Sequence, residues 1–393
     1  MGVRKLKIVT VLGARPQFIK AAPVSALIRE KYRGRIREIL VHTGQHYDRN
    51  MSDIFFQQMR IPSPKYHLGV GGGTHGAMTG RMMEKIEQVL KKENPDWVLV
   101  YGDTNSTLAG ALAAAKLHIP VAHVEAGLRS FNMRMPEEIN RILTDRISSL
   151  LFCPTRTAIQ NLKKEGLQQG AVLTGDVMFD AARFYRPFAE KIPLQKWGLR
   201  QKDYVFCTAH RQENTDNVEN LRQILEALRR ISHGFSVVFA IHPRTRKVIH
   251  GNRDLKEILR EGNSDFGIRI AEKERTGKKA VGITVLDPLS YLETQRLVMG
   301  AKAVLTDSGG LQKEAFFHRV PCVTLREETE WVETVKSGLN QLAGVSIKKI
   351  LRAFREVTAS GCETKGVFFK TNSCGSLKIL HFLMRSPQKR RVE

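Results

Sequence analysis

The chain has 393 residues, of which 42% are hydrophobic and 26% are charged, and its formal net charge is +24. This length exceeds that of one ordinary domain, and the composition is that of a globular protein able to bury a core. No apolar run approaches the roughly 18 residues that span a bilayer. The short run Ile8–Leu12, followed by Gly13, indicates a first strand rather than a signal peptide. We therefore expect a soluble, cytoplasmic protein without a membrane partner.

Cysteine usage and charge distribution narrow the class further. The five cysteines form no CxxC pair, so neither a disulfide framework nor a zinc site is predicted. Residues 345–393 contain 11 Lys or Arg against 3 Asp or Glu, which places +8 of the net charge in a short tail. The other basic residues are scattered, without the aromatic residues of a single-strand binder. A nucleic-acid-binding module remains a remote alternative, but we expect a solvated basic surface and no nucleic-acid partner.

Short apolar runs alternate with helical patterns along the first half of the chain. The predicted helices have apolar residues at helical spacing, as in Met78, Met82, Ile86 and Val89. The predicted strands are Ile8–Leu12, Ile36–Val41, Trp97–Tyr101, Val121–Val124, Leu150–Cys153 and Ala171–Leu173. The predicted helices are Phe18–Glu30, Met78–Lys92, Ser106–Leu117 and Glu137–Ile147.

The second half repeats this alternation. Its predicted strands are Tyr204–Cys207, Val237–Ile241, Thr284–Leu286, Ala303–Leu305 and Cys322–Leu325, and its helices are Val218–Ile231, Tyr291–Met299 and Gly310–Phe317. Apolar strands separated by helices predict an α/β fold of two Rossmann-like, doubly wound parallel sheets. We expect the domains to span residues 1–185 and 186–345, with a break near Phe184–Leu194 where Pro187 and Pro193 occur. Residues 346–393 form a basic tail of unassigned structure.

Parallel sheets bind ligands at the carboxyl ends of their strands, so the polar residues there are the functional candidates. The first strand leads into Gly13-Ala14-Arg15-Pro16, which brings Arg15 and Lys20 to a helix start that suits an anion. Asp103 and Glu125 follow two later strands, at one edge of the sheet. Asp103 could instead cap the next helix.

Two further candidates lie on the following helix. Glu137 and Arg141 are four residues apart and share a helical face. In sequence terms the two residues could simply be a surface ion pair; the functional alternative is that Arg141 holds the Glu137 carboxylate near the ligand.

In the second half, Ser308-Gly309-Gly310 lies between a strand and a helix, where free backbone N–H groups suit a pyrophosphate. His210 and Arg244 follow other strands and could add charge-assisted hydrogen bonds to the same group. Glu314, one turn into the helix, could accept hydrogen bonds from ribose hydroxyls. The chain has no GxxxxGK[ST] loop, no GxGxxG after the first strand and no HExxH, so no cofactor and no metal are predicted.

Together these residues closely resemble the non-hydrolysing UDP-N-acetylglucosamine 2-epimerase family. The resemblance covers about residues 5 to 345, in unbroken order. Its strongest parts are Gly13–Pro16, Gly102–Thr104, His123–Gly127, Pro136–Glu138 with Arg141, His242–Thr245 and Asp307–Gly310. The resemblance implies two Rossmann-like domains facing across a cleft, the glycosyltransferase-B architecture. It also implies a homodimer that needs no metal or nicotinamide.

The resemblance also implies the reaction. The proton on carbon 2 of a UDP-N-acetylated sugar is removed, UDP leaves from carbon 1, and UDP then adds back while a proton is delivered to the opposite face. Asp103, Glu125 and Glu137 match the essential carboxylates of the family. The positions that match its phosphate-, nucleotide- and ribose-binding residues are Arg15, Lys20, His210, Ser308, Gly309, Gly310 and Glu314. Gln45, His46 and Arg81 resemble positions that bind a second, activating UDP-sugar in some bacterial members.

Two departures from the family pattern affect the substrate and the chain end. Many UDP-N-acetylglucosamine enzymes have Thr-Glu-Arg-Pro-Glu where this chain has Thr329–Glu333 with Trp331, which resembles the branch acting on UDP-2,3-diacetamido-2,3-dideoxyglucuronate. After Val345, the closing Gly-rich segment and final helix of the family are not recognisable. The alternatives are a glycosyltransferase that uses a UDP-sugar and a hydrolysing epimerase that releases free N-acetylmannosamine.

Overall fold

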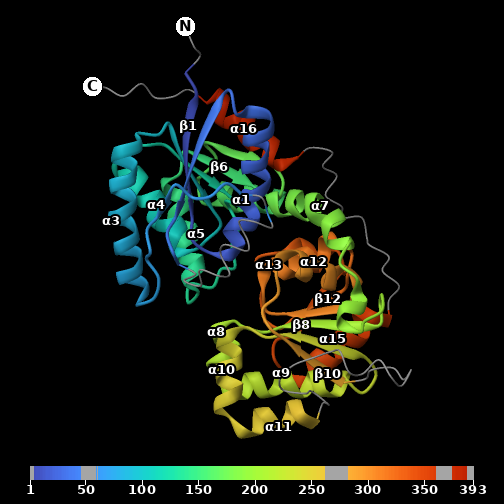
Figure 1. The fold of residues 1–393 in the computed structure, drawn as a ribbon. Coiled ribbons are helices and arrows are strands. Elements are labelled where there is room, and N and C mark those ends of the chain that lie inside the picture. Colours follow the sequence, from blue (N-terminus) through green and yellow to red (C-terminus); the bar gives the residue numbers. More distant parts are fainter. Residues whose placement is uncertain (1–3, 46–58, 60, 262–281, 360–373, 387–393) are drawn as a thin grey trace. The chain divides into compact units, whose positions relative to one another are not determined.

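The computed structural model describes residues 4–45, 59, 61–261, 282–359 and 374–386. It divides into two compact units. The first contains residues 1–184 together with 369–393, and the second contains residues 185–368. Each unit is built on one parallel β-sheet with helices between the strands (Figure 1). The predicted fold class, two doubly wound parallel sheets, is confirmed.

The sheet of the first unit has seven strands in the order β3-β2-β1-β4-β5-β6-β7, all parallel. Its strands are β1 (Leu6–Leu12), β2 (Ile36–His42), β3 (Tyr66–His67), β4 (Trp97–Tyr101), β5 (Val121–Val124), β6 (Leu150–Cys153) and β7 (Ala171–Leu173). The order reverses between β1 and β4. In sheets of this kind a ligand crevice opens where the strand order reverses, so the loops after β1 and β4 lie where the candidate residues of this unit are expected.

Helices cover both faces of this sheet. The bounds are α1 (Arg15–Leu27), the π-helical η1 (Ile28–Tyr32), α3 (His75–Glu93), α4 (Asn105–Lys116), α5 (Pro136–Ile147), α6 (Arg156–Lys164) and, near the end of the chain, α16 (Gly375–Arg385). Helix α7 (Val177–Glu190) begins in this unit and continues into the second, which starts at Tyr185. Figure 1 shows α3, α4 and α5 on one side of the sheet and α1 and α16 on the other. Met78, Met82, Ile86 and Val89 of α3 are buried in the core of this unit. Their helical spacing therefore reports packing, as predicted.

The second sheet has six parallel strands in the order β10-β9-β8-β11-β12-β13, and its order reverses between β8 and β11. Its strands are β8 (Tyr204–Thr208), β9 (Ser236–Ala240), β10 (Gly282–Leu286), β11 (Ala303–Thr306), β12 (Cys322–Thr324) and β13 (Asn340–Leu342). Its helices are η2 (Leu194–Trp197, a 3₁₀ turn), α8 (Gln212–Thr215), α9 (Val218–Ile231), α10 (Pro243–Gly251), α11 (Arg253–Glu261), α12 (Tyr291–Gly300), α13 (Gly309–Phe317), α14 (Val332–Lys336) and α15 (Ile347–Ala359).

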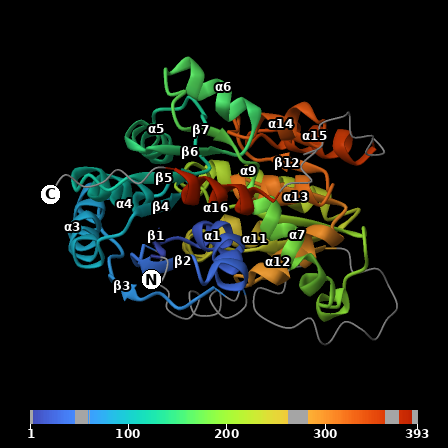
Figure 2. The ribbon, with the colours of Figure 1, turned by 90° about the horizontal axis from the view of Figure 1, so that it is seen from above.

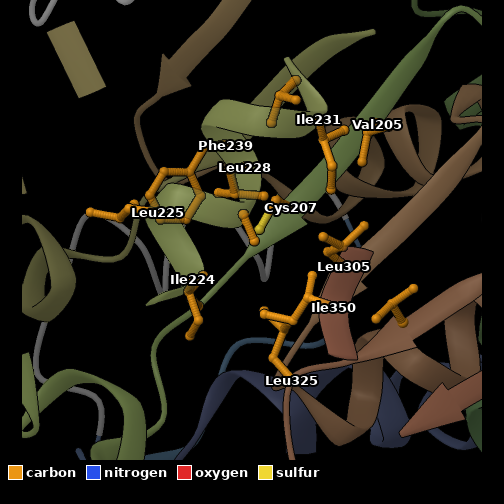
Figure 3. Packing of buried hydrophobic residues seen from close by; sticks show 14 of the residues in the cluster. Val205, Cys207, Ile224, Leu225, Leu228, Ile231, Phe239, Leu305, Leu325 and Ile350 are labelled. Atoms are coloured by element: carbon orange, nitrogen blue, oxygen red, sulfur yellow. The ribbon is translucent and has the colours of Figure 1, made fainter. Parts of the chain in front are cut away.

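Alternate residues of β8 supply the two cores of the second unit. Val205 and Cys207 pack with α9 and α15 on one face, a cluster drawn in Figure 3. Tyr204 and Phe206 pack on the opposite face with residues of α12 and α13. Successive side chains of a strand point to opposite faces, so one fully buried strand serves both cores. This explains why the strands of the second half are apolar throughout.

The structure corrects the expectation that Pro187 interrupts the regular structure between the two units. Pro187 does not break the chain into a linker, because α7 continues through it to Glu190. A proline this close to a helix end disturbs only the last turn, so the helix persists. The sequence left the structure after residue 345 unassigned, and α15 and α16 lie in this segment. The basic residues Lys389, Arg390 and Arg391 lie outside the described residues.

The final helix α16 packs against the first unit. Ile379, Leu380 and Leu383 of this helix are buried, and Figure 2 shows α16 beside α1. Its start is anchored by Asp180 of α7, whose Oδ2 accepts hydrogen bonds from the Ser376 N–H and Oγ at 2.7 Å each. Helix α16 therefore packs in the same unit as β1, the first strand of the chain.

Candidate active site

The loop after β1 is held so that its glycine cannot be replaced. A Cβ atom on Gly13 would lie 2.1 Å from both Ser106 Oγ and Thr43 Oγ1, so no side chain fits there. The amide oxygen of Gln17 accepts hydrogen bonds from the N–H groups of Gly13 and Ala14, at 2.8 and 2.9 Å. The turn is therefore fixed where α1 begins. Arg15 is the first residue of that helix, next to the strand reversal.

A buried ion pair lies at the ends of β4 and β5. Lys20 of α1 contacts the carboxylate of Glu125, and each residue is only 7% exposed. Gly102 lies against the pair, since a Cβ there would come within 2.9 Å of Lys20 Nζ. Glu125 has a backbone φ of +76°, which is costly for a residue with a side chain. Its N–H donates to the Phe152 carbonyl at 3.0 Å, which holds this conformation.

The second carboxylate of this edge is also bound to a buried cation. Arg141 of α5 donates to Asp103 Oδ2 at 2.7 Å and also pairs with Glu138 at 3.1 Å. Asp103 does not cap the following helix, because Thr104 occupies the N-cap of α4. Asp103 remains about one-third exposed at its side chain, whereas Arg141 is buried. The buried Arg141 therefore orients the Asp103 carboxylate, while part of that carboxylate stays exposed to solvent.

Glu137 is half-buried in the first turn of α5, where its neighbour Glu138 is fully buried. Glu138 accepts hydrogen bonds from Ser130 N–H at 3.0 Å and Phe131 N–H at 2.9 Å, so it anchors the loop before α5. The sequence predicts that Arg141 shares a face with Glu137, and the structure adds an ion pair of Arg141 with Glu138. The i,i+3 spacing of Glu138 and Arg141 was the signal that could have found it.

Of the three residues predicted to bind a second, activating UDP-sugar, the structure describes Gln45 and Arg81. Gln45 Oε1 accepts hydrogen bonds from Ser106 N–H and Oγ at 3.1 and 2.7 Å, beside the start of α4. Arg81 of α3 donates to the Gly72 carbonyl at 2.9 Å on the surface. His46 lies outside the described residues. The structure therefore places Gln45 in the edge that holds Asp103.

The corresponding edge of the second sheet is organised around Asp307, which follows β11 and is fully buried. Its Oδ2 accepts hydrogen bonds from the N–H groups of His210 and Arg211, at 2.8 and 2.9 Å, and from Asn214 Nδ2 at 3.0 Å. In the sequence, Asp307 stands out only as the start of the turn Asp307–Gly310. In the structure it fixes the loop after β8.

The helix start after Asp307 is built as the sequence predicts. Ser308 is the N-cap of α13, and its Oγ accepts from the Leu311 N–H at 3.4 Å. Gly309 and Gly310 form the first turn. A Cβ on Gly309 would lie 2.2 Å from Glu330 Oε1, so this turn is closely packed. Glu314 follows one turn later and is 5% exposed. The N–H groups of such a turn bind anions.

The two basic candidates of this unit are placed differently. His210 Nδ1 lies 3.6 Å from Asp307 Oδ1, and its ring is 5.6 Å from that of His242. Arg244 of α10 pairs with Asp216 through contacts of 2.9 and 3.1 Å at the surface. The structure thus brings His210 against Asp307, the residue before Ser308. Arg244 is instead paired with Asp216, which the sequence did not single out.

Comparison with known proteins supplies the family. The model of the UDP-N-acetylglucosamine 2-epimerase family matches residues 29–376. The chain belongs to this family. A UDP-2,3-diacetamido-2,3-dideoxy-D-glucuronate 2-epimerase of Pseudomonas aeruginosa is 50% identical over 97% of this chain and 100% of its own length. A UDP-N-acetylglucosamine 2-epimerase homolog of Methanococcus maripaludis is 48% identical over 96% and 99%.

A solved structure agrees with this family assignment. Methanocaldococcus jannaschii UDP-GlcNAc 2-epimerase, in complex with UDP-GlcNAc and UDP, superimposes with a TM-score of 0.84 at 41% identity. The superposition covers 97% of this chain and 99% of that one. The predicted family and enzyme class, an epimerase, are therefore confirmed. The similarity to the family continues past residue 345, where the sequence analysis had ended it.

Two findings concern metals and membranes. Among the described residues, no group of three or more His, Cys, Asp or Glu side chains is arranged to hold a metal ion. The same residues contain no helix long and apolar enough to span a bilayer.

Cys153, Cys207, Cys322 and Cys374 are free thiols, while Cys362 lies outside the described residues. Burial raises the pKa of the Cys322 thiol to about 12, so it is unreactive.

Proposed function

We propose that this family member epimerises carbon 2 of a UDP-activated 2-acetamido sugar without net hydrolysis. The observation that carries the proposal is the edge of the first sheet, where Glu125 and Asp103 each contact a buried cation. Acid–base catalysis at a carbon centre needs carboxylates held at fixed positions and in fixed protonation states. The family relationship supplies the reaction to which such a pair is suited.

The proposed chemistry proceeds by elimination and re-addition. A carboxylate removes the proton from carbon 2, the bond between carbon 1 and the UDP oxygen breaks, and a 2-acetamidoglucal forms. UDP then adds back to carbon 1, and an acid delivers a proton to the opposite face of carbon 2. We assign this work to Asp103, Glu125 and Glu137 of the first unit, without dividing acid and base between them.

We assign the departing UDP to residues of the second unit. The start of α13 at Ser308, Gly309 and Gly310 offers N–H groups to the pyrophosphate, and His210 beside it adds a donor. Glu314 is assigned to the ribose. The ion pair of Arg244 with Asp216 is exposed and therefore exchangeable. We assign Arg15, Lys20 and Arg141 of the first unit to substrate binding.

The sugar itself is one of two. The relatives named above act, by their names, on UDP-N-acetylglucosamine or on UDP-2,3-diacetamido-2,3-dideoxy-D-glucuronate. Trp331 stands where many UDP-N-acetylglucosamine enzymes have arginine, and Lys313 Nζ lies 3.8 Å from the centre of its ring. This replacement supports the uronate. We place the product in the synthesis of surface polysaccharide precursors in the cytoplasm.

The deciding experiment is turnover of each candidate UDP-sugar in deuterated water, followed by proton nuclear magnetic resonance. We expect deuterium at carbon 2 and a mixture of two epimers that still carry UDP. UDP release that depends on an acceptor would support the glycosyltransferase, and free N-acetylmannosamine would support the hydrolysing epimerase. Binding and turnover without exchange at carbon 2 would contradict the proposal.

We also propose a homodimer and a regulatory role for Gln45 and Arg81. Four large apolar side chains are exposed in and before α5 of the first unit, which is a surface suited to a second copy. They are Phe131, Met133, Ile139 and Leu143. Light scattering of the purified protein tests the dimer, with Ile139→Lys expected to give monomers. Hyperbolic kinetics that remain unchanged in Arg81→Ala would contradict the regulatory role.

A further inference from the structure

His123 is a fully buried histidine in β5 whose two ring nitrogens both face oxygen atoms at short distance. Its Nε2 lies 2.7 Å from the backbone carbonyl oxygen of Gly102, at the end of β4. Its Nδ1 lies 2.7 Å from Oδ1 of Asp145, in α5. None of the catalytic or binding roles proposed above uses this ring. It lies two residues before Glu125 and contacts the residue before Asp103.

The identity of the two oxygens fixes the protons of the ring. A backbone carbonyl can only accept, so Nε2 must carry a proton. An ionised carboxylate can also only accept, so Nδ1 must carry one too. A neutral ring would place an unshared electron pair against an oxygen at 2.7 Å on one side. Only the doubly protonated ring donates to both neighbours.

The alternative is that Asp145 carries the second proton, and its other contacts argue against this. Asp145 Oδ2 accepts from Arg129 Nη1 at 2.7 Å and from the Gly127 N–H at 3.0 Å. Burial raises the pKa of this carboxyl, but the contacts with His123 and Arg129 lower it by more than burial raises it. The pKa of Asp145 therefore lies below its ordinary value. A carboxylate beside an arginine stays ionised. The proton therefore resides on the imidazole.

The charges around the ring balance. Arg129 donates through Nε and Nη2 to both oxygens of Glu165, at 2.7 Å each. The row His123, Asp145, Arg129, Glu165 therefore alternates in sign, which is how buried charges are tolerated. From β6, Cys153 faces this row as a thiol whose pKa is raised by burial and by Asp145. The Lys20–Glu125 pair lies beside Gly102 on its other side.

This row flanks a residue in a strained backbone conformation, Glu125. Gly102, Glu125 and Gly127 have φ angles of +66°, +76° and +79°. Glycine adopts such angles at little cost, but Glu125 keeps this conformation only because its surroundings impose it. His123 fixes the carbonyl of Gly102, and Asp145 fixes the N–H of Gly127, on either side of Glu125. Both loops that present the proposed catalytic carboxylates are thereby tied to one ring.

We propose that His123 is a buried, doubly protonated cation that positions the two loops carrying Asp103 and Glu125. Its protonation state follows from the contacts alone, whereas its role in turnover rests on the proposed function. His123 acts through Gly102 and Asp145 and is therefore a positioning residue. It takes no part in the proton transfer itself.

The protonation state is tested in the resting wild-type enzyme at pH 7.5. Protein labelled with ¹⁵N in histidine is studied by long-range proton–nitrogen correlation spectra, and the His123 signal is assigned through contacts to the Gly127 amide. We expect both ring nitrogens to carry slowly exchanging protons. One unprotonated ring nitrogen would overturn the proposal. This measurement needs neither substrate nor turnover, so it stands even if the proposed reaction fails.

The positioning role is tested with a pair of neutral variants. His123→Asn places an amide donor near the Nδ1 position and keeps the bond to Asp145, whereas His123→Gln places one near Nε2 and keeps the bond to Gly102. We expect each to lower kcat at least tenfold while KM changes less than about threefold, because displaced loops lose near-attack geometry. The control is His118→Asn, on the exposed surface of the same unit.

A structural role alone would give a different result. The variants would then melt at lower temperature, yet the folded fraction would keep the wild-type kcat and rate of deuterium exchange at carbon 2. That outcome would overturn the positioning role. If the wild-type enzyme showed no exchange at carbon 2, the proposed function would fail, and the nitrogen spectra would still decide the state of His123.

Discussion

The two units share one sheet design and place their candidate residues in the same position, but they use charge differently. In the first unit, the edge beside the strand reversal holds carboxylates paired with buried cations, such as Glu125 with Lys20 and Asp103 with Arg141. In the second unit, the buried Asp307 accepts backbone N–H groups, and the helix start beside it holds no acidic residue in its first turn. The first edge is suited to proton transfer, and the second to binding an anion.

The sharpest test of this difference is Glu125→Gln. The amide keeps the size of the side chain but can no longer take a proton, so we expect kcat to fall by about 10²–10⁴-fold. UDP affinity should change much less than kcat, because we assign the pyrophosphate and ribose contacts to Ser308, Gly309, Gly310 and Glu314 of the second unit. The assays are deuterium exchange at carbon 2 and calorimetric titration with UDP. Exposed Glu84→Gln in α3 is the matched control. A kcat within threefold of wild type would remove Glu125 from the chemistry.

The second test asks whether the final helix is part of the first unit in energetic terms. Leu383 of α16 is fully buried, so Leu383→Ala should lower the free energy of unfolding of this unit by about 2–4 kcal/mol. Exposed His381→Ala on the same helix is the control. Hydrogen exchange read by mass spectrometry should show faster exchange in α1 and α16 and unchanged protection in α9. Equal loss of protection in both units would contradict the division.

The fold was largely predictable because its strands are continuous apolar runs. The two strands that escaped prediction, β3 and β13, have only two and three residues, too few for a periodic signal. Helix α16 was missed for another reason. Its buried residues pack on elements more than 180 residues earlier, such as Asp180 with Ser376, and no local pattern reveals that contact.

The candidate residues were predictable in position but not in partnership. The rule that ligands bind at strand ends selected Asp103, Glu125 and Ser308 from the sequence. Their partners depend on register and helix rotation, which local sequence does not determine. Lys20 and Glu125 are 105 residues apart, and His123 looked like an ordinary strand residue. The supporting contacts therefore emerged only with the structure.

The third test addresses the anion-binding side of the comparison. In Gly309→Ala, the new methyl group would meet Glu330, which is held by Arg326 at 3.1 Å. The carboxylate or the helix start must move, so we expect about tenfold weaker UDP binding, or roughly 1.4 kcal/mol. Gly234→Ala, at a position with open space around it, is the control. Unchanged UDP affinity would show that the start of α13 does not bind the nucleotide.

The smallest expected effect concerns acid stability, where the units again differ. In the second unit, burial and the nearby Arg186 lower the pKa of His318 to about 4. In the first, hydrogen bonds from Lys65, Tyr66 and Lys7 outweigh burial and lower the pKa of Glu93 to about 2. Both pKa values are lower in the folded chain than in the unfolded chain, so unfolding favours protonation of His318 and of Glu93. His318 therefore stabilises fully above about pH 6.5 and less as pH falls toward 4, whereas Glu93 loses its contribution only below about pH 4.5.

Between pH 6.5 and 4.5 the second unit alone should weaken through these groups. We expect it to lose about 1 kcal/mol at pH 5.5 relative to pH 7.5. Urea unfolding can follow each unit separately, with Trp97 as reporter of the first and Trp197 of the second, the other tryptophans being replaced by phenylalanine. His318→Gln should flatten the pH dependence of the second unit, because no proton is then taken up on unfolding. If that variant kept the wild-type slope, a different group would be responsible for the acid sensitivity of the second unit.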